Sequence, residues 1–70
     1  MRILSRDGKH LVDVSNGGYL NTYDYAVWFV FYNSDFADLR LGGYSSEERA
    51  KDVIFEIAQH KESLYVMPEV

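Results

Sequence analysis

The sequence has 70 residues, no cysteine, and a formal net charge of −4 at pH 7. A chain of this length forms one domain, so a second domain is excluded. The absence of cysteine excludes disulfides and thiolate zinc sites, which stabilise many small domains. Because small domains without such crosslinks often associate instead, we expect a homo-oligomer.

The charge balance also limits the possible partners. The sequence has 7 Lys and Arg residues and 11 Asp and Glu residues, and the basic residues are not clustered. Nucleic acid requires a clustered basic surface, so direct nucleic-acid binding is not expected. An acidic surface is typical of a solvated small domain, and it also suits a basic partner protein. The sequence shows neither a leader pattern nor an apolar run of about 20 residues. We therefore expect a cytoplasmic protein without membrane contact.

The first part of the sequence is typical of strands. Asp7-Gly8 favours a tight hairpin turn between the segments 1–5 and 10–14. A turn-rich segment then precedes residues 19–23, whose structure the sequence leaves open. The aromatic and β-branched segment 25–32 predicts a central strand, and the alternation over 37–44 predicts another.

A helix is predicted over about 46–60. Ser45 and Glu48 match a capping box, and an apolar stripe follows at spacings of three and four. Residues 64–67 predict a short last strand. Together these segments predict one α+β domain, residues 1–70, with the helix on one face of an antiparallel sheet of about four or five strands. The residues of the apolar stripe are Ala50, Val53, Ile54, Ile57 and Ala58.

The central strand is apolar on both faces, because alternate side chains point to opposite sides. One helix covers only one face of a sheet, so the other face must meet water, a ligand or another chain. The face expected under the helix carries Tyr25, Val27, Phe29 and Phe31, with Val12, Val14, Leu39 and Leu41 from other strands. The uncovered face is expected to carry Arg2, Leu11, Trp28, Val30, Tyr32 and Arg40.

This uncovered face is the main candidate for function, since Trp, Tyr and Arg dominate binding hot spots. Two interpretations remain open. The face is either a binding interface or a second core covered by residues 19–23 or by the last strand. If the surface is self-complementary, its partner is a second copy of the chain. Phe55 lies off the helix stripe and is expected to be exposed, which also favours association.

Other charged residues give weaker signals. Glu48, Asp52 and Glu56 follow each other at intervals of four on the helix, so they form either an acidic contact for a partner or a solvated side. His10 and His60 have no spacing typical of a metal site, and no nucleophile accompanies them. No catalytic residue, metal or cofactor is therefore expected.

Three segments carry a resemblance: MRILSRDG at 1–8, LGGYSSEERA at 41–50 and YVMPE at 65–69. They resemble a group of small proteins that are common in Gram-positive bacteria, their phages and mobile elements. The resemblance implies a hairpin, strand and helix plan and a phage or prophage origin, and it supplies no catalytic residues.

Small acidic phage proteins without enzymatic motifs often bind and block a host factor. The resemblance therefore leads us to expect a non-enzymatic inhibitor or sequestering protein directed at a bacterial host factor such as a defence component. It would block a host protein or trap a nucleotide signal between aromatic and Arg side chains at an oligomer interface. The alternative is a homo-oligomeric structural or regulatory phage module without such a target.

Overall fold

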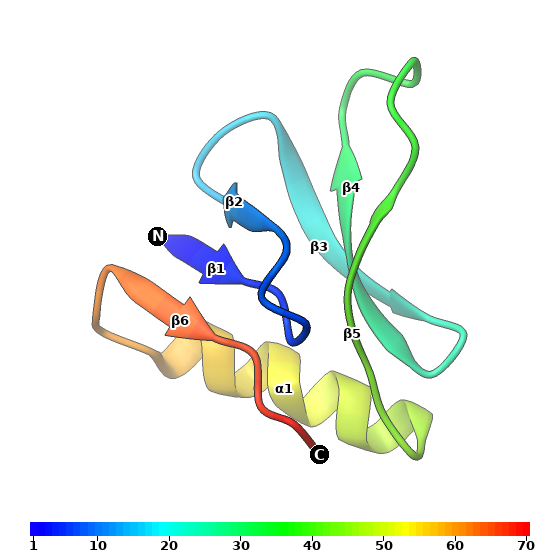
Figure 1. The fold of residues 1–70 in the computed structure, drawn as a ribbon, viewed down its shortest axis with the longest axis vertical. Helices are drawn as coiled ribbons and strands as arrows, with labels where there is room; N and C mark the ends of the chain where they lie inside the picture. The colour runs from blue at the N-terminus through cyan, green and yellow to red at the C-terminus, as the bar shows by residue number, and fades with distance from the viewer.

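A computed structural model describes residues 1–70. It confirms an α+β fold with one helix, and it resolves the open segment 19–23 as part of a strand. The helix begins and ends within one residue of the predicted limits. In chain order the elements are β1 (Arg2–Leu4), β2 (Leu11–Asp13), β3 (Gly18–Tyr23), β4 (Ala26–Phe31), β5 (Leu39–Gly43), α1 (Glu47–Gln59) and β6 (Leu64–Val66) (Figure 1).

The strands form two sheets of three strands, where the sequence predicted one sheet of four or five. In the order β2-β1-β6, β1 is antiparallel to β2 and parallel to β6. The second sheet has the order β3-β4-β5 and is antiparallel throughout. Gly17 has a φ of 88° and redirects the chain between the sheets, a conformation that glycine adopts without a side-chain clash. The chain then returns through α1, the kind of crossover that a parallel strand pair needs.

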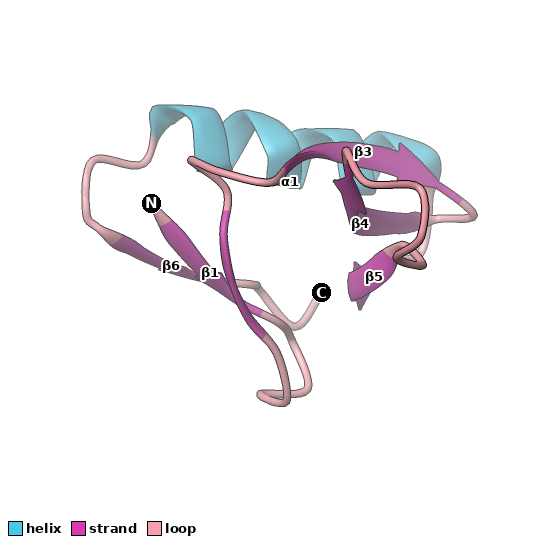
Figure 2. Cartoon of the chain, turned by 90° about the horizontal axis from the view of Figure 1, so that it is seen from above, coloured by secondary structure: helices cyan, strands magenta, loops and turns pink.

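One core fills the space between the two sheets and the helix. Figure 2 shows α1 lying across both sheets, which diverge below it. Each sheet therefore has one covered face and one outer face. The buried core residues are Ile3, Val12, Val27, Phe29, Leu41, Ala50, Val53, Ile57, Tyr65 and Met67.

A β-bulge in β5 lies where the two sheets contact each other. Val27 pairs with Gly42 and Trp28 pairs with Arg40, so Leu41 is an extra residue on β5. The Leu41 side chain is only 1% exposed and fills the core. Its carbonyl oxygen is directed away from β4 and accepts a hydrogen bond from the other sheet's hairpin.

Arg6 makes that connection. Its backbone N–H donates to the Leu41 carbonyl at 2.8 Å. Its guanidinium donates to the main-chain oxygens of Gly43 and of Glu69, the latter at 2.8 Å. Arg6 therefore ties the turn of the first hairpin to the edge of β5 and to the segment that follows β6.

The helix cap differs from the predicted capping box by one residue. Ser46, rather than Ser45, is the N-cap, and its Oγ accepts a hydrogen bond from the Arg49 backbone N–H at 3.0 Å. Because the cap moves by one position, Arg49 occupies the place that Glu48 was expected to fill. The reciprocal bond of a capping box is therefore absent.

Tyr25 was predicted to face the core, but it lies in the β3–β4 turn and is 58% exposed. Tyr23 pairs with Ala26, which leaves Asp24 and Tyr25 as a two-residue loop with φ angles of 55° and 58°. Positive φ at both positions is typical of a type I′ turn, which matches the twist of the two strands. The Tyr25 N–H donates to the Glu47 carboxylate at 2.6 Å, which holds the turn against the start of α1.

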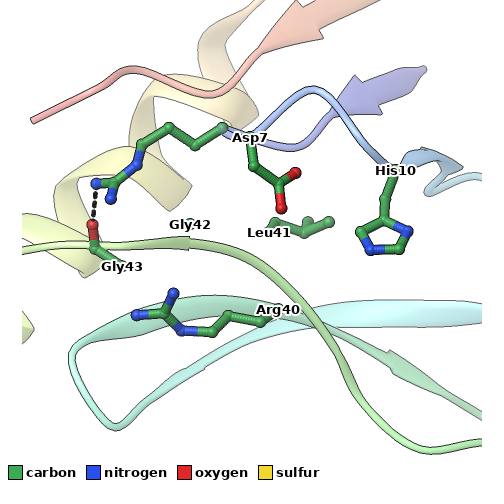
Figure 3. A pocket seen from close by; sticks show the side chains of 7 residues that line it. Asp7, His10, Arg40, Leu41, Gly42 and Gly43 are labelled. Atoms are coloured by element: carbon green, nitrogen blue, oxygen red, sulfur yellow. Dashed lines mark hydrogen bonds between the residues drawn. The ribbon is translucent and has the colours of Figure 1, made fainter.

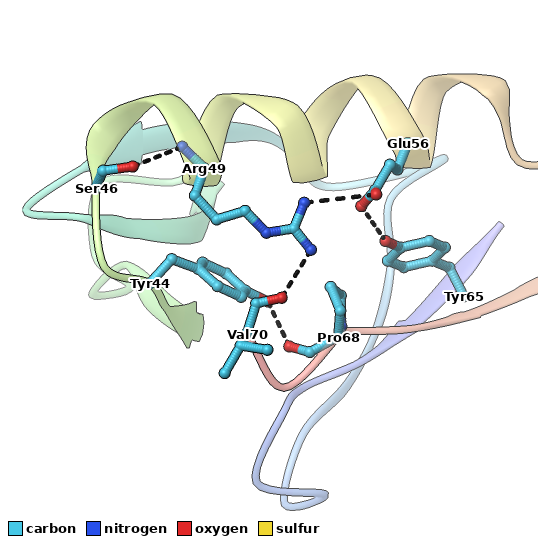
Figure 4. A network of polar contacts seen from close by, with 7 residues as sticks. All are labelled: Tyr44, Ser46, Arg49, Glu56, Tyr65, Pro68 and Val70. Carbon is cyan, nitrogen blue, oxygen red and sulfur yellow. Dashed lines mark hydrogen bonds and ion pairs between the residues drawn. The ribbon is translucent and has the colours of Figure 1, made fainter.

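A polar network fastens α1 to β6 and the segment after it (Figure 4). The Tyr65 hydroxyl donates to the Glu56 carboxylate at 3.3 Å, and Arg49 lies 3.5 Å from the same carboxylate. The Tyr44 hydroxyl donates to the Pro68 carbonyl at 2.8 Å. Burial, together with the negative charge of Glu56, raises the pKa of Tyr65 to about 12.

Candidate functional site

The outer face of the β3-β4-β5 sheet is rich in aromatic side chains. Tyr19 lies opposite Val30, and Trp28 lies between Asn21 and Arg40 in the strand register. The inner face of the same sheet belongs to the core, so these outward side chains have no covering element. We call this surface the aromatic face; it consists of Tyr19, Asn21, Tyr23, Trp28, Val30, Tyr32, Asp38 and Arg40.

Trp28 and Tyr23 form the ordered centre of the aromatic face. Their rings stack with centroids 4.5 Å apart and planes within 6°. The Trp28 indole N–H donates to the Tyr23 carbonyl at 3.0 Å, and the Tyr23 hydroxyl donates to the Asp38 carboxylate at 2.6 Å. This bond to a carboxylate is the main reason why the pKa of Tyr23 rises to about 12. Both rings are held in place before any partner arrives, which reduces the entropy lost on binding.

Tyr19 and Tyr32 form the more open end of this face. Their ring centroids are 5.8 Å apart, and the planes are inclined by 38°. The Tyr32 side chain is 73% exposed, although its backbone N–H is held by the Gly17 carbonyl at 3.0 Å. A fixed backbone therefore presents a large aromatic side chain to solvent.

The structure brings Trp28, Val30 and Arg40 together on one face, with Tyr32 just beyond the end of β4. Arg2 and Leu11 do not join them. Both belong to the β2-β1-β6 sheet, where their side chains lie on its outer face. The six residues were expected on one surface, but they are divided between two sheets. The strands that carry Arg2 and Leu11 pair with each other, and those that carry Trp28 and Arg40 pair with each other.

The outer face of the β2-β1-β6 sheet is mainly aliphatic. Leu4 lies between Leu11 and Val66 in the register, and Leu64 lies beside Arg2 on the next rung. Leu11 is 54% exposed, while Val12 beside it in sequence is only 9% exposed and belongs to the core. We call the surface formed by Leu4, Leu11, Leu64 and Val66 the aliphatic face.

The predicted helix residues lie on α1, where Phe55 lines a pocket together with Asn21 of the aromatic face. Phe55 is 67% exposed on α1, as its place off the apolar stripe indicated. Glu48 and Asp52 are exposed on the same helix, whereas Glu56 accepts a hydrogen bond from Tyr65. The acidic stripe therefore has one member engaged within the fold and two directed to solvent.

Sequence reasoning missed Tyr19, Tyr23 and Asp38. The first two lie in the segment 19–23, whose structure the sequence leaves open, and no sequence pattern points to Asp38. A signal was present, because Tyr19, Asn21 and Tyr23 alternate with smaller or aliphatic residues at the period of a strand. What concealed it was the following turn, which lacks the usual Asn-Gly or Asp-Gly pair.

Few groups in the structure are arranged for chemistry. No three His, Asp or Glu side chains converge in a way that could hold a metal ion. His10 is exposed in the hairpin turn, and no hydrogen bond orients its imidazole ring. The helix has 13 residues and is neither long nor apolar enough to cross a membrane.

No known protein family, curated protein or solved structure matches this chain.

Proposed function

We propose that this protein is a non-enzymatic binding protein that docks onto another protein through the aromatic face. The observation that carries the proposal is the Trp28–Tyr23 stack, an ordered aromatic pair on a sheet face that no other element covers. Arg40 lies beside Trp28, and the exposed Tyr32 ring lies at the other end of the same face. Trp, Tyr and Arg are the residues most enriched among binding hot spots.

The energetics support this role for a small protein. Aromatic side chains bury large areas and lose few rotamers, so a handful of them can dominate the binding free energy. Here the hydrogen bonds of Trp28 and Tyr23 already restrict their rings. A partner that covers them therefore gains contact area with a small ordering cost.

The proposed partner is a bacterial host protein, with a defence component as the target class. This part of the proposal rests on the resemblance to small proteins of Gram-positive bacteria and their phages. The net charge of −4 favours a partner whose docking surface is basic. Occupying such a surface would block the host protein without any reaction.

Capture from a bacterial host lysate tests the proposal. We expect the wild-type protein and the control Leu11→Ala to retain the same partner, and Trp28→Ala and Tyr32→Ala to lose it. Tyr32 is the more informative site, since its exposed side chain contributes little to folding. A partner lost with Leu11→Ala and retained with Tyr32→Ala would overturn the assignment to this face, and no captured partner would overturn the proposal.

A homo-oligomeric structural or regulatory module is the second candidate, and the aliphatic face favours it. Leu11 on β2 and Leu64 and Val66 on β6 expose apolar surface on the two sides of Leu4. A two-fold contact could cover this surface on both copies. Light scattering after size exclusion would then show an oligomer that Leu11→Asp dissociates, whereas a strict monomer would contradict this candidate.

A further inference from the structure

A polar pocket of about 260 Å³ lies along the edge of β5 (Figure 3). The turn of the first hairpin forms one wall with Arg6, Asp7 and His10, and β5 forms the other with Arg40 and two glycines. A water molecule occupies about 30 Å³ of liquid volume, so the pocket has room for a group the size of a phosphate. It adjoins the aromatic face, with which it shares Arg40, but the stacked rings of Trp28 and Tyr23 do not line it.

Two guanidinium groups line this pocket near Gly43, and they approach β5 from opposite sides (Figure 3). Arg6 donates to the Gly43 carbonyl oxygen from one side. Arg40 lies over the same glycine, since a Cβ on residue 43 would be 1.9 Å from its Nη2 atom. Arg6 is held by its hydrogen bonds, and Arg40 occupies space that exists because residue 43 has no side chain.

Neither guanidinium forms an ion pair with a carboxylate. The ion pairs of the structure join the Met1 amino group to Asp13 and Arg49 to Glu56, both away from the pocket. Two like charges that line one pocket repel each other, and an anion bound in the pocket would reduce that repulsion. The pocket therefore has an electrostatic reason to hold an anion.

Asp7 is the one acidic side chain of the lining, and the hairpin turn engages it. Its carboxylate accepts from the Ser5 hydroxyl at 2.6 Å and from the Lys9 backbone N–H at 2.9 Å. These bonds lower the pKa of Asp7 and keep it charged. The lining therefore carries two arginine charges and one carboxylate charge that is already hydrogen-bonded. Its net charge is positive.

We propose that this pocket binds the phosphate group of a small molecule, held chiefly by Arg40 and Arg6. The planar guanidinium matches two phosphate oxygens at once, which favours phosphate over a spherical anion such as chloride. Figure 3 shows the His10 ring at the end of the pocket away from the two guanidinium groups, where it adds a polar group to the lining. This site goes beyond protein docking and does not depend on it.

Titrations followed by amide NMR test the site, with inorganic phosphate in one arm and adenosine monophosphate in the other. Each arm is matched in ionic strength by sodium chloride. We expect saturable shifts of the Gly42 and Gly43 amides, and an affinity at least about tenfold lower for Arg40→Gln, which loses a charged bidentate donor. The control Lys61→Gln removes the same charge from an exposed loop and should bind like wild type.

A second variant separates geometry from charge. Gly43→Ala keeps both arginines but displaces the Arg40 guanidinium, so it should weaken phosphate binding while the protein remains folded. Binding in either arm that both pocket variants weaken supports the site, and the tighter arm shows whether the phosphate is free or carried by a nucleoside. Three results would overturn the site. Sodium chloride alone could reproduce the amide shifts, Lys61→Gln could weaken binding as much as the pocket variants do, or neither phosphate nor adenosine monophosphate could bind.

Discussion

The two outer faces of this protein follow the same alternation but present different chemistry. The aliphatic face consists of branched side chains with no hydrogen-bonding groups, on strands of three residues. The aromatic face lies on longer strands and orders its own side chains through the Trp28–Tyr23 stack and the bond to Asp38.

Because their side chains differ, the two faces suit different kinds of contact. Aliphatic groups give non-directional burial, which suits a self-contact of modest specificity. Stacked aromatic rings with fixed polar edges give area and direction together, which suits a particular partner. On this ground we propose target recognition for the aromatic face, and self-association, as the second candidate, for the aliphatic face.

The largest expected effect comes from separating the two sheets. Arg6→Ala removes the guanidinium bonds to Gly43 and Glu69, and hydrogen bonds from charged donors contribute about 1.5–3 kcal/mol. We expect a loss of that size in the free energy of unfolding, measured by urea denaturation. Arg2→Ala, which removes an arginine from an outer face, should change it by less than about 0.5 kcal/mol. Equal effects of the two variants would show that the Arg6 guanidinium does not stabilise the contact between the sheets.

Truncation of one residue on each face compares the two surfaces directly. Trp28→Ala removes a half-buried ring and its stack with Tyr23, so we expect a loss of about 1–3 kcal/mol in the free energy of unfolding. Leu11→Ala should cost less than about 1 kcal/mol, because its side chain is already half exposed. Urea denaturation of both variants measures the difference, and a larger loss at Leu11 would reverse the ranking of the two faces.

A substitution in the turn that follows β3 should increase the stability of the protein. Tyr25 holds a positive φ that costs a non-glycine residue about 1–2 kcal/mol. Tyr25→Gly should therefore raise the free energy of unfolding by up to about 1 kcal/mol once the flexibility of glycine is included. The control Tyr19→Gly has no such strain to relieve and should destabilise β3. A destabilised Tyr25→Gly protein would contradict the presence of strain.

Alkaline titration gives the smallest effect and concerns the aromatic face alone. The pKa of Tyr23 rises from 10.0 to about 12, so the folded state keeps this proton longer than the unfolded state. Its contribution to stability is complete below pH 10 and is lost as the pH approaches 12. Tyrosinate absorbance should show Tyr23 titrating late, and Asp38→Asn should lower its pKa. Tyr65 titrates late for another reason, burial, and should not respond to this change.

Local patterns in the sequence were sufficient for much of the fold. The Asp7-Gly8 pair predicted the first turn, where Gly8 has a φ of 75°. The stripe through Ala50, Val53 and Ile57 predicted the helix and its buried side. These features depend on neighbours within a few residues, so a linear sequence carries them.

The alternation of β4 also indicated which residues share a face, and Trp28 and Arg40 do so. It could not indicate which strands belong to one sheet, because period-two patterning sets the side on which a residue lies and not its partner strand. Arg2 and Leu11 were therefore placed beside Trp28, although they lie in the other sheet.

By itself the sequence determined the fold class, the helix, the first hairpin and the outward direction of Trp28 and Arg40. Only the tertiary structure decided the division into two sheets, the bulge at Leu41 and the pocket that Arg6 and Arg40 line near Gly43. These features are set by hydrogen bonds and packing between segments far apart in the chain, such as the Arg6 bond to Leu41. Local propensity contains no information about such pairs, since each depends on the burial of the whole core.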